Sequence, residues 1–308
     1  MVEVTNLCKD YGPIRAIDHV SFQLKKGDVV GFLGPNGAGK STTMKIVTGF
    51  MAPTSGEARI AGYDVFENPI EVKRRIGYLP ETPPVYADMF VRDYLTYVAE
   101  LKKVPRDQIQ KNVDLVIQKT HLESVSKRLI GVLSKGFKQR VGIAQALVSQ
   151  PDVLILDEPT VGLDPKQVAE IRELIKELRG QHTIILSTHI LSEVQAVCDK
   201  AIIINKGKIV AEDSIANLGR LEKGSAAVRI RLRQGRDLNT LLAQIPGLIG
   251  VTGHGQNWEI QFNGDEQVHD QILAKLVESR IGLVEFSPKT LDLEDVFLKL
   301  TYGQEVNV

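Results

Sequence analysis

Uninterrupted apolar runs mark segments of the chain that should be buried on both faces. They occupy residues 29–33, 153–156, 183–187 and 201–204. The last three alternate with segments of helical spacing at 165–179 and 190–198. Strands buried on both faces are typical of parallel sheets covered by helices. The pattern therefore predicts an α/β core built on a parallel sheet.

Two other kinds of spacing flank these runs. Apolar and polar residues alternate over 2–7, 20–24 and 58–65, as expected of half-exposed antiparallel strands. Between about 84 and 150 the apolar residues recur at helical spacing. We therefore expect a small antiparallel β subdomain beside the parallel sheet, and a helical insertion at about 84–150 between the two halves of that sheet.

The composition changes after about residue 220, and residues 221–225 are typical of a linker. We expect a first domain over 1–220 and a second over 221–308. The second has the order β-α-β-β-α-β, the split βαβ arrangement, which indicates a small α+β fold. Its predicted strands lie near 228–232, 247–252, 258–262 and 283–286, and its predicted helices near 237–245 and 266–279.

Arg229, Arg231 and Arg233 alternate with apolar residues in the first strand of this second domain. Such a stripe suits either a nucleic-acid surface or a solvated strand face. The 308 residues include 38 Lys+Arg and 38 Asp+Glu, so no overall field favours nucleic acid or an anionic membrane surface. We favour the solvated face and expect no nucleic-acid partner.

Composition also bounds where the protein works. Hydrophobic residues make up 43% and charged residues 25%, as in soluble globular proteins, and two cysteines are too few for a disulfide framework. No window approaches about 18 consecutive apolar residues, and the first residues lack the features of a signal peptide. We expect a cytosolic chain, so any membrane-spanning segments would belong to a partner.

A glycine-rich segment directly follows the strand at 29–33 and fits the phosphate-binding pattern G-x-x-x-x-G-K-[ST]. Its glycines let successive N–H groups face phosphate oxygens, and the following helix presents its positive end to the same anion. Lys40 is expected to reach the β/γ-phosphates and Ser41 to ligate Mg²⁺. The strand before this segment and the helix after it argue against the alternative, a glycine-rich turn that binds no ligand. The predicted loop comprises Gly34, Pro35, Asn36, Gly37, Ala38, Gly39, Lys40, Ser41 and Thr42.

Two carboxylates, Asp157 and Glu158, follow the apolar strand at 153–156. Ligands of open α/β sheets bind at the carboxyl ends of the strands. Asp157 is predicted to support Mg²⁺, and Glu158 to orient or deprotonate an attacking water. The alternative is a helix N-cap, which both residue types also suit. The phosphate loop favours the catalytic interpretation.

Five motifs together resemble the ATP-binding cassette (ABC) ATPases across residues 1 to about 220. They are the phosphate loop, the segment Leu133-Ser134-Lys135-Gly136-Phe137-Lys138-Gln139-Arg140-Val141, Asp157-Glu158, Gly162-Leu163-Asp164 and Ser187-Thr188-His189. The resemblance implies a P-loop NTPase core of the RecA-like kind that binds ATP and Mg²⁺. It also implies a head-to-tail dimer, either a homodimer or a pair of related cassettes. In that dimer the signature residues Ser134, Lys135, Gly136 and Gln139 of one copy face the ATP of the other.

Further residues resemble family positions one by one. Tyr11 is similar to the aromatic residue that stacks on adenine, with a core tyrosine as the alternative. His189 resembles the switch histidine that bonds the γ-phosphate and the attacking water, although a lone histidine is more often structural. Asp164 resembles the loop residue that links the two sites across the dimer, with helix capping as the alternative.

The chain departs from the family pattern at two positions. Glu81 stands where most members carry glutamine, so it keeps an oxygen for Mg²⁺ but loses the amide donor. Lys135 stands where glycine is usual, which either strengthens anion binding or leaves the cation in solvent. With the segments 79–81 and 86–89, these features resemble cassettes of bacterial type-2 ABC exporters, including gliding-motility-associated ones. Residues 293–301 resemble the closing helix of their accessory domain.

The resemblance implies the ATPase subunit of a membrane transporter of the exporter kind, lying on the inner face of the cell membrane against separate permease subunits. A soluble ABC ATPase of translation or DNA repair is the alternative. Such proteins usually join two cassettes or carry coiled-coil insertions, and this sequence has one cassette without sustained heptads. The second domain suits dimerisation, docking or ligand sensing.

Overall fold

A six-stranded sheet with the order β10-β9-β3-β8-β7-β6 organises the N-terminal part of the chain. The first five strands along the chain run parallel and the last, β10, is antiparallel at the edge. Every residue of β3, β7 and β8 is buried. The predicted parallel strands are confirmed, and β6 and β10 add two strands that the apolar runs did not indicate. The bounds are β3 (Val29–Leu33), β6 (Ile76–Leu79), β7 (Val153–Asp157), β8 (Thr183–Thr188), β9 (Lys200–Asn205) and β10 (Lys208–Ser214).

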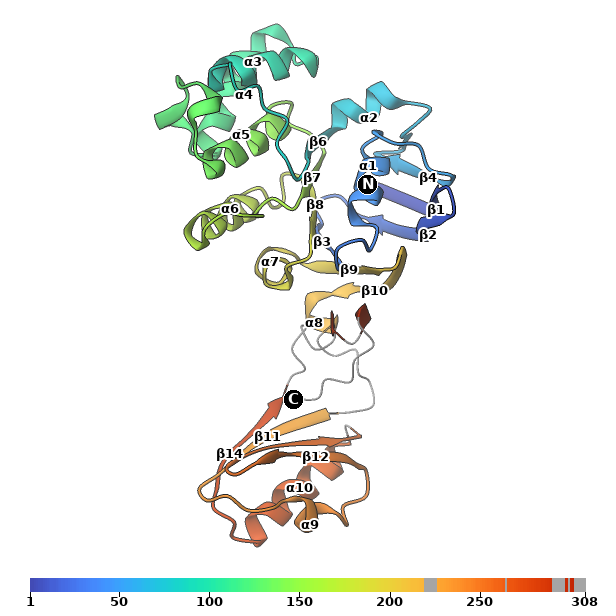
Figure 1. The fold of residues 1–308 in the computed structure, drawn as a ribbon, viewed down its shortest axis with the longest axis vertical. Coiled ribbons are helices and arrows are strands. Elements are labelled where there is room, and N and C mark those ends of the chain that lie inside the picture. The colour runs from blue at the N-terminus through green and yellow to red at the C-terminus, as the bar shows by residue number, and fades with distance from the viewer. Residues whose placement is uncertain (219–225, 264, 290–296, 299, 302–308) are drawn as a thin grey trace. The chain divides into compact units, whose positions relative to one another are not determined.

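The computed structural model describes residues 1–218, 226–263, 265–289, 297–298 and 300–301. The chain divides into two compact units, Met1–Ile215 and Ala216–Val308 (Figure 1). The predicted linker at 221–225 and most of the predicted closing helix at 293–301 lie outside the described residues. The short helix α8 (Ile215–Leu218) begins where the first unit ends.

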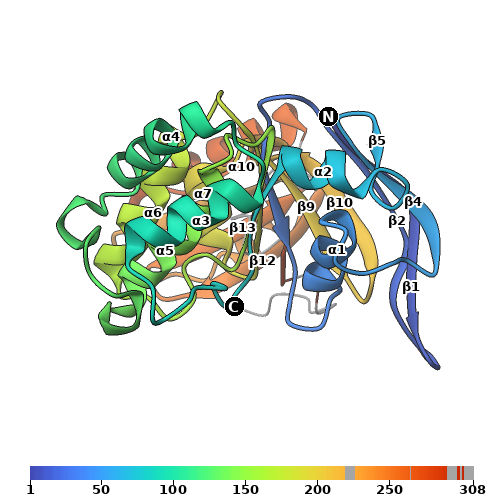
Figure 2. The same ribbon diagram turned by 90° about the horizontal axis from the view of Figure 1, so that it is seen from above.

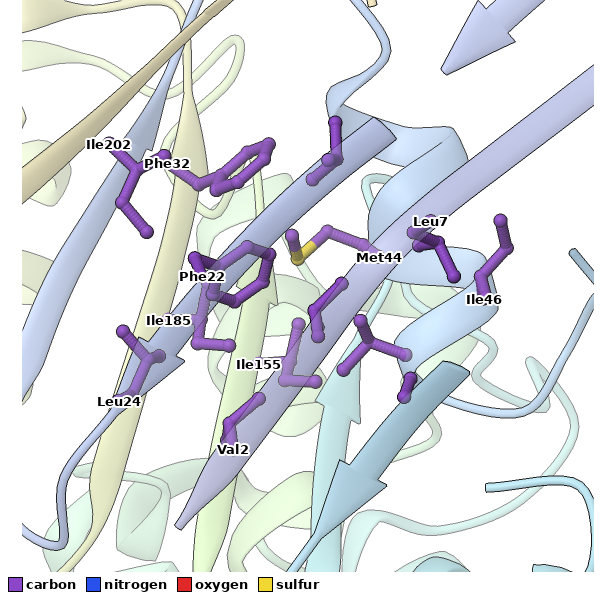
Figure 3. Close-up of a cluster of buried hydrophobic side chains, with 14 of the residues drawn as sticks. Val2, Leu7, Phe22, Leu24, Phe32, Met44, Ile46, Ile155, Ile185 and Ile202 are labelled. Atoms are coloured by element: carbon purple, nitrogen blue, oxygen red, sulfur yellow. The ribbon is translucent and has the colours of Figure 1, made fainter. Parts of the chain in front are cut away.

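A second sheet in the first unit is antiparallel, with the order β2-β1-β4-β5. It confirms the predicted β subdomain. Helix α1 (Lys40–Val47) contributes Met44 and Ile46 to a core that joins residues of both sheets, among them Phe22 and Phe32 (Figure 3). This packing holds the start of α1 against the parallel sheet. The strands are β1 (Val2–Tyr11), β2 (Ile14–Leu24), β4 (Ser55–Ile60) and β5 (Tyr63–Asp64).

Helices cover the other side of the parallel sheet. Three of them, α3, α4 and α5, pack on one another and form the predicted helical insertion, while α6 and α7 follow later strands (Figures 1 and 2). The short α2 precedes β6. The bounds are α2 (Pro69–Arg75), α3 (Val91–Leu101), α4 (Arg106–Lys119), α5 (Lys135–Leu147), α6 (Pro165–Glu177) and α7 (Leu191–Val197). Two 3₁₀ turns, Glu123–Val125 and Ile130–Val132, lie between α4 and α5.

The second unit has the element order β11-α9-β12-β13-α10-β14, which confirms the predicted split βαβ pattern. Its antiparallel sheet has the order β12-β13-β11-β14. Trp258, Ile260 and Ile272 belong to its apolar core, whereas Arg231 is exposed and pairs with Glu285. The bounds are β11 (Ala226–Leu232), α9 (Asn239–Leu242), β12 (Leu248–His254), β13 (Asn257–Phe262), α10 (Glu266–Glu278) and β14 (Leu283–Lys289).

Gly77 in β6 tests the packing of α5 on the sheet. A Cβ at this position would lie 2.1 Å from the carbonyl oxygen of Ala146, a backbone atom that cannot turn aside. Gly77→Ala is therefore expected to lower the free energy of unfolding by roughly 1–3 kcal/mol, the usual effect of overpacking. Urea unfolding followed by circular dichroism measures this difference. Gly250→Ala, where an added methyl meets nothing within 4 Å, is the control. Equal stability of both variants would contradict this packing.

Candidate functional site

The glycine-rich loop lies between the end of β3 and the start of α1, as the sequence predicted. Gly39 is the N-cap of α1 and has φ 109°, a left-handed conformation that strains any other residue. Gly34 is buried, and a Cβ there would lie 2.3 Å from the carbonyl oxygen of Ile204. Asn36 and Gly37 are exposed. The loop thus wraps the N-terminus of α1 and leaves its tip open to solvent.

Lys40 is the first residue of α1 and is almost fully buried. Its Nζ donates to the carbonyl oxygens of Gly34 at 2.7 Å and Pro35 at 3.2 Å. The same Nζ lies 3.7 Å from Oε1 of Glu158. Burial lowers the pKa of Lys40, and the charges of Glu158 and Asp157 act in the opposite direction. The ammonium therefore sits inside the loop, next to the carboxylates that follow β7.

Asp157 ends β7 and is 2% exposed. The hydroxyl of Ser187, on the neighbouring strand β8, donates to its Oδ1 at 2.7 Å. Burial raises the pKa of Asp157, while hydrogen bonds from Ser187 and Ser41 lower it. Ser41 belongs to the phosphate loop, so the loop and the end of β7 meet at this carboxylate.

Glu158 is the next residue, and its backbone is in the left-handed region with φ 49°. Its N–H donates to the carbonyl oxygen of Ser187 at 2.8 Å, which ties the turn to β8. Oε1 lies 2.9 Å from Nδ1 of His189, and the hydroxyl of Thr188 lies 3.3 Å from Oε2. The fold therefore brings Lys40, Glu158 and His189 together around one carboxylate oxygen.

Strand order explains this meeting. Strand β8 lies between β3 and β7, and all three run parallel. Their carboxyl ends consequently share one edge of the sheet, where ligands of such sheets bind. The loop after β3, the carboxylates after β7 and His189 after β8 all come from that edge.

Two predicted residues lie farther from this centre. Glu81 follows β6 and is exposed, yet its charge acts on both Asp157 and Lys40. Tyr11 ends β1 and is 44% exposed, and its hydroxyl lies 2.9 Å from Sδ of Met51. Tyr11 is therefore a partly exposed aromatic residue and not the core tyrosine that the sequence left as its alternative.

The signature segment surrounds the N-terminus of α5. Ser134 is the N-cap, and its Oγ accepts from the N–H of Phe137 at 3.4 Å. Ser134 and Lys135 are exposed, but Gln139 is 3% exposed. The side chain of Gln139 thus faces the interior and presents no surface to another molecule. Gly136 makes room for Gln167, since a Cβ there would lie 2.3 Å from its Oε1.

The loop before α6 packs beside this segment. Asp164 is the N-cap of α6, and its Oδ1 accepts from the N–H of Gln167 at 3.0 Å. The capping role that the sequence left open is therefore present. Gly162 has φ 68°, and a Cβ there would lie 2.1 Å from Nζ of Lys135. The unusual lysine of the signature lies against this loop.

Three buried side chains near Glu158 were given no role by the sequence, although Thr188 stands in the motif Ser187-Thr188-His189. They are Thr160, Thr188 and Glu193, each less than 5% exposed. Glu193 accepts hydrogen bonds from both threonine hydroxyls. An acidic residue in the first turn of a helix is common because it interacts favourably with the helix dipole, so the sequence carried no signal that this one is buried.

A glycine-rich loop with a lysine lies at the N-terminus of α1. Paired carboxylates lie at the end of β7, which is separated from β3 by one strand in the sheet. This arrangement defines a P-loop nucleoside triphosphatase. The family model for ABC transporters matches residues 17–161. The bacitracin transport ATP-binding protein BcrA of Bacillus licheniformis is 35% identical, with 98% of each chain covered. The chain therefore belongs to the ABC transporter ATP-binding proteins and is an ATP-hydrolysing subunit of this family.

A second relative and a solved structure also resemble the chain. The linearmycin resistance ATP-binding protein LnrL of Bacillus subtilis is 30% identical, with 98% of each chain covered. A solved dimeric structure of an ATP-binding cassette in a post-hydrolysis state, bound to ADP and Pi, matches with TM-score 0.64 and 25% identity. That match covers 70% of this chain and 98% of the other. These likenesses favour the transporter over the soluble ATPase of translation or DNA repair.

No helix of the described residues is both long enough and apolar enough to cross a membrane.

Asp157 should make the protein less stable near neutral pH, because its buried carboxyl is costly to ionise. Its folded-state pKa is raised, so its contribution to stability is present below the ordinary pKa of 3.8 and is lost as pH rises. Asp157→Asn, which keeps an acceptor for Ser187, is expected to raise the unfolding midpoint without ligand at pH 7. The gain should vanish below about pH 3.8. Urea unfolding across this pH range measures it, with the exposed Asp88→Asn as control. A gain that persists in acid would contradict the argument.

Proposed function

We propose that the chain is the motor subunit of an exporter: two copies, or this chain and a related cassette, enclose two ATP molecules and drive a separate permease. The observation that carries this proposal is the grouping of Lys40, His189 and Glu158 at the sheet edge, where Oε1 of Glu158 lies 2.9 Å from Nδ1 of His189.

The phosphates of ATP fit the N-terminus of α1. The loop from Gly34 to Thr42 offers backbone N–H groups there, and an anion is stabilised by the positive end of the helix. Lys40 would leave the carbonyl oxygens of its own loop and donate to the β/γ-phosphates. Tyr11, which is 44% exposed at the end of β1, would stack on adenine.

The donor set near Asp157 fits Mg²⁺, which prefers hydroxyl, carboxylate and water oxygens. Asp157 is a buried carboxylate whose pKa is raised by burial, and a cation would stabilise its charge. Ser41 and Asp157 would hold the ion, and the exposed Glu81 would approach from β6. The bound ion would neutralise charge on the phosphate oxygens.

Glu158 would accept a proton from the attacking water or hold that water in line with the γ-phosphate. It is buried but within reach of the loop, because its Oε1 lies 3.7 Å from Nζ of Lys40. His189 is exposed beside it and would donate to the γ-phosphate. Ordered donors around the developing charge are the main source of catalysis in such sites.

A second copy would complete the site through its signature segment. Ser134 and Lys135 are exposed at the N-terminus of α5, where an anion is stabilised, and the dimeric cassette structure supports this arrangement. The buried Gln139 is left out of this surface. Asp164 is exposed on the adjoining loop and would reach the other site while it also caps α6.

The role of Glu158 as the base for ATP hydrolysis is tested by the variant Glu158→Gln. The amide keeps the shape but cannot accept a proton, so kcat should fall by about 10²- to 10⁴-fold. ATP binding should persist, and the variant should accumulate as a closed dimer with ATP. A phosphate-release assay and size-exclusion chromatography measure the two effects. Glu173→Gln, on the exposed face of α6, is the control. Unchanged turnover in Glu158→Gln would remove Glu158 from the mechanism.

A cavity of about 370 Å³ offers a place for the permease. It is lined by Tyr86, Tyr94 and Tyr97 and by the two lysines Lys73 and Lys102. It opens between α3 and the segment after β6, where Pro84 also lines it. Exposed aromatic residues are typical anchors of protein interfaces. Movements of Glu81 and β6 during ATP hydrolysis would be transmitted to a permease segment bound here.

If the aromatic residues of this cavity bind the permease, their loss should weaken permease binding and leave ATP hydrolysis intact. Tyr86→Ala/Tyr97→Ala should weaken binding to the co-expressed membrane subunit by about ten-fold or more, the usual loss of two interface anchors. The ATPase activity of the purified subunit should change by less than about two-fold, because neither residue touches the site. Co-sedimentation with proteoliposomes and an ATPase assay measure both. Phe66→Ala, exposed but outside the cavity, is the control. Full binding by the double variant would exclude this docking site.

The two units support a nucleotide-binding domain over 1–220, with the helical subdomain at about 84–150, and an accessory domain over 221–308, although the structural division falls after Ile215. The functions for which the relatives BcrA and LnrL are named, bacitracin transport and linearmycin resistance, support export as the direction of transport. The protein would lie on the inner face of the cell membrane, where its permease places it.

A further inference from the structure

Glu193 is a buried carboxylate that the mechanism above does not use. It lies in the first turn of α7 and is 1% exposed. Within the part of the chain that the structure describes, it forms no ion pair, and its hydrogen-bond donors are the hydroxyls of Thr160 and Thr188. A buried charge without a cation is costly to maintain. The position of its two donors indicates what this charge does.

Both donors belong to the segments that carry the proposed catalytic groups. Thr160 follows Glu158 by two residues, and Thr188 immediately precedes His189. Oε1 of Glu193 accepts from Thr160, and Oε2 accepts from Thr188 at 3.0 Å. One carboxylate therefore joins the turn after β7 to the end of β8.

The hydroxyl of Thr188 lies between two carboxylates. Its Oγ1 is 3.0 Å from Oε2 of Glu193 and 3.3 Å from Oε2 of Glu158. The same Oγ1 accepts from the N–H of Ile190 at 3.1 Å. A hydroxyl has a single proton, so it can donate to only one carboxylate at a time.

We propose that Glu193 is a positioning residue that takes the hydrogen bond of Thr188 and thereby keeps Oε2 of Glu158 free to accept from the attacking water. This inference rests on the catalytic role of Glu158 proposed above. Without the acceptor at position 193, the Thr188 hydroxyl donates to Glu158 and occupies the oxygen that the water needs. Glu193 acts through Thr188 and touches no part of the nucleotide.

The test compares Glu193→Met in two backgrounds. Methionine has a similar length and is apolar, but it offers no carboxylate oxygen to Thr188. In the natural background, kcat for ATP hydrolysis with Mg²⁺ should fall by about ten-fold, and KM for ATP should change by less than about two-fold. In the Thr188→Val background, where there is no hydroxyl to misdirect, the same substitution should lower kcat by less than about two-fold.

Three results would overturn the proposal. They are an unchanged kcat in Glu193→Met, an equal loss in both backgrounds, and a loss in kcat that is matched by a rise in KM and a lower unfolding midpoint. If Glu193→Met does not fold, Thr188→Val alone decides. It removes the competing proton, so its kcat should fall by less than about three-fold, and a loss as deep as that of Glu158→Gln would contradict the proposal.

Glu158→Gln, measured alongside, separates this inference from the function on which it rests. If Glu158→Gln keeps its turnover, the assignment of Glu158 fails. If Glu158→Gln loses turnover and Glu193→Met does not, only the role of Glu193 fails.

Discussion

The burial of charge at the carboxyl edge of an apolar sheet is the constraint on which this structure depends. Lys40, Asp157 and Glu158 are each less than 10% exposed, and ionised groups in such places need partners that the fold holds in position. Strands β3, β7 and β8 are fully buried and paired in register, so the groups at their ends have little freedom to move apart. The core shared by both sheets fixes α1 and its lysine in the same way.

The neighbours of these charges are mostly neutral or belong to the backbone. Lys40 is held by two carbonyl oxygens, Asp157 by the hydroxyl of Ser187, and Glu193 by two threonines. Such partners offset part of the cost of burial without neutralising the charge. In the proposed mechanism, the charges of Lys40 and Asp157 therefore remain available for phosphate and a metal ion. Such a site lowers the free energy of unfolding relative to an apolar one, and ligands that bind the folded protein raise it again.

Sequence patterns predicted the elements that local chemistry specifies. The buried strands, the glycine loop and the split βαβ order could be predicted because each is indicated by apolar spacing or glycine positions within a short stretch of the chain. Strands β6 and β10 were not visible. Strand β6 spans only Ile76–Leu79 and includes Gly77. In β10, at the edge of the sheet, exposed and partly buried residues alternate. Short or edge strands are stabilised by partners from distant parts of the sequence, which spacing does not reveal.

The sequence by itself determined the family and the candidate residues for a triphosphate site, since the motif of Gly34 to Thr42 and the pair Asp157-Glu158 are defined by residue type and spacing. Only the tertiary structure decided which of them meet. The position of β8 between β3 and β7 places His189 and Thr188 against Glu158, and it turns Glu193 from a helix-end charge into a buried acceptor. The same packing places Gln139 inside and leaves Ser134 exposed. Strand order and burial arise from contacts between segments far apart in the chain, and a linear pattern carries no record of those contacts.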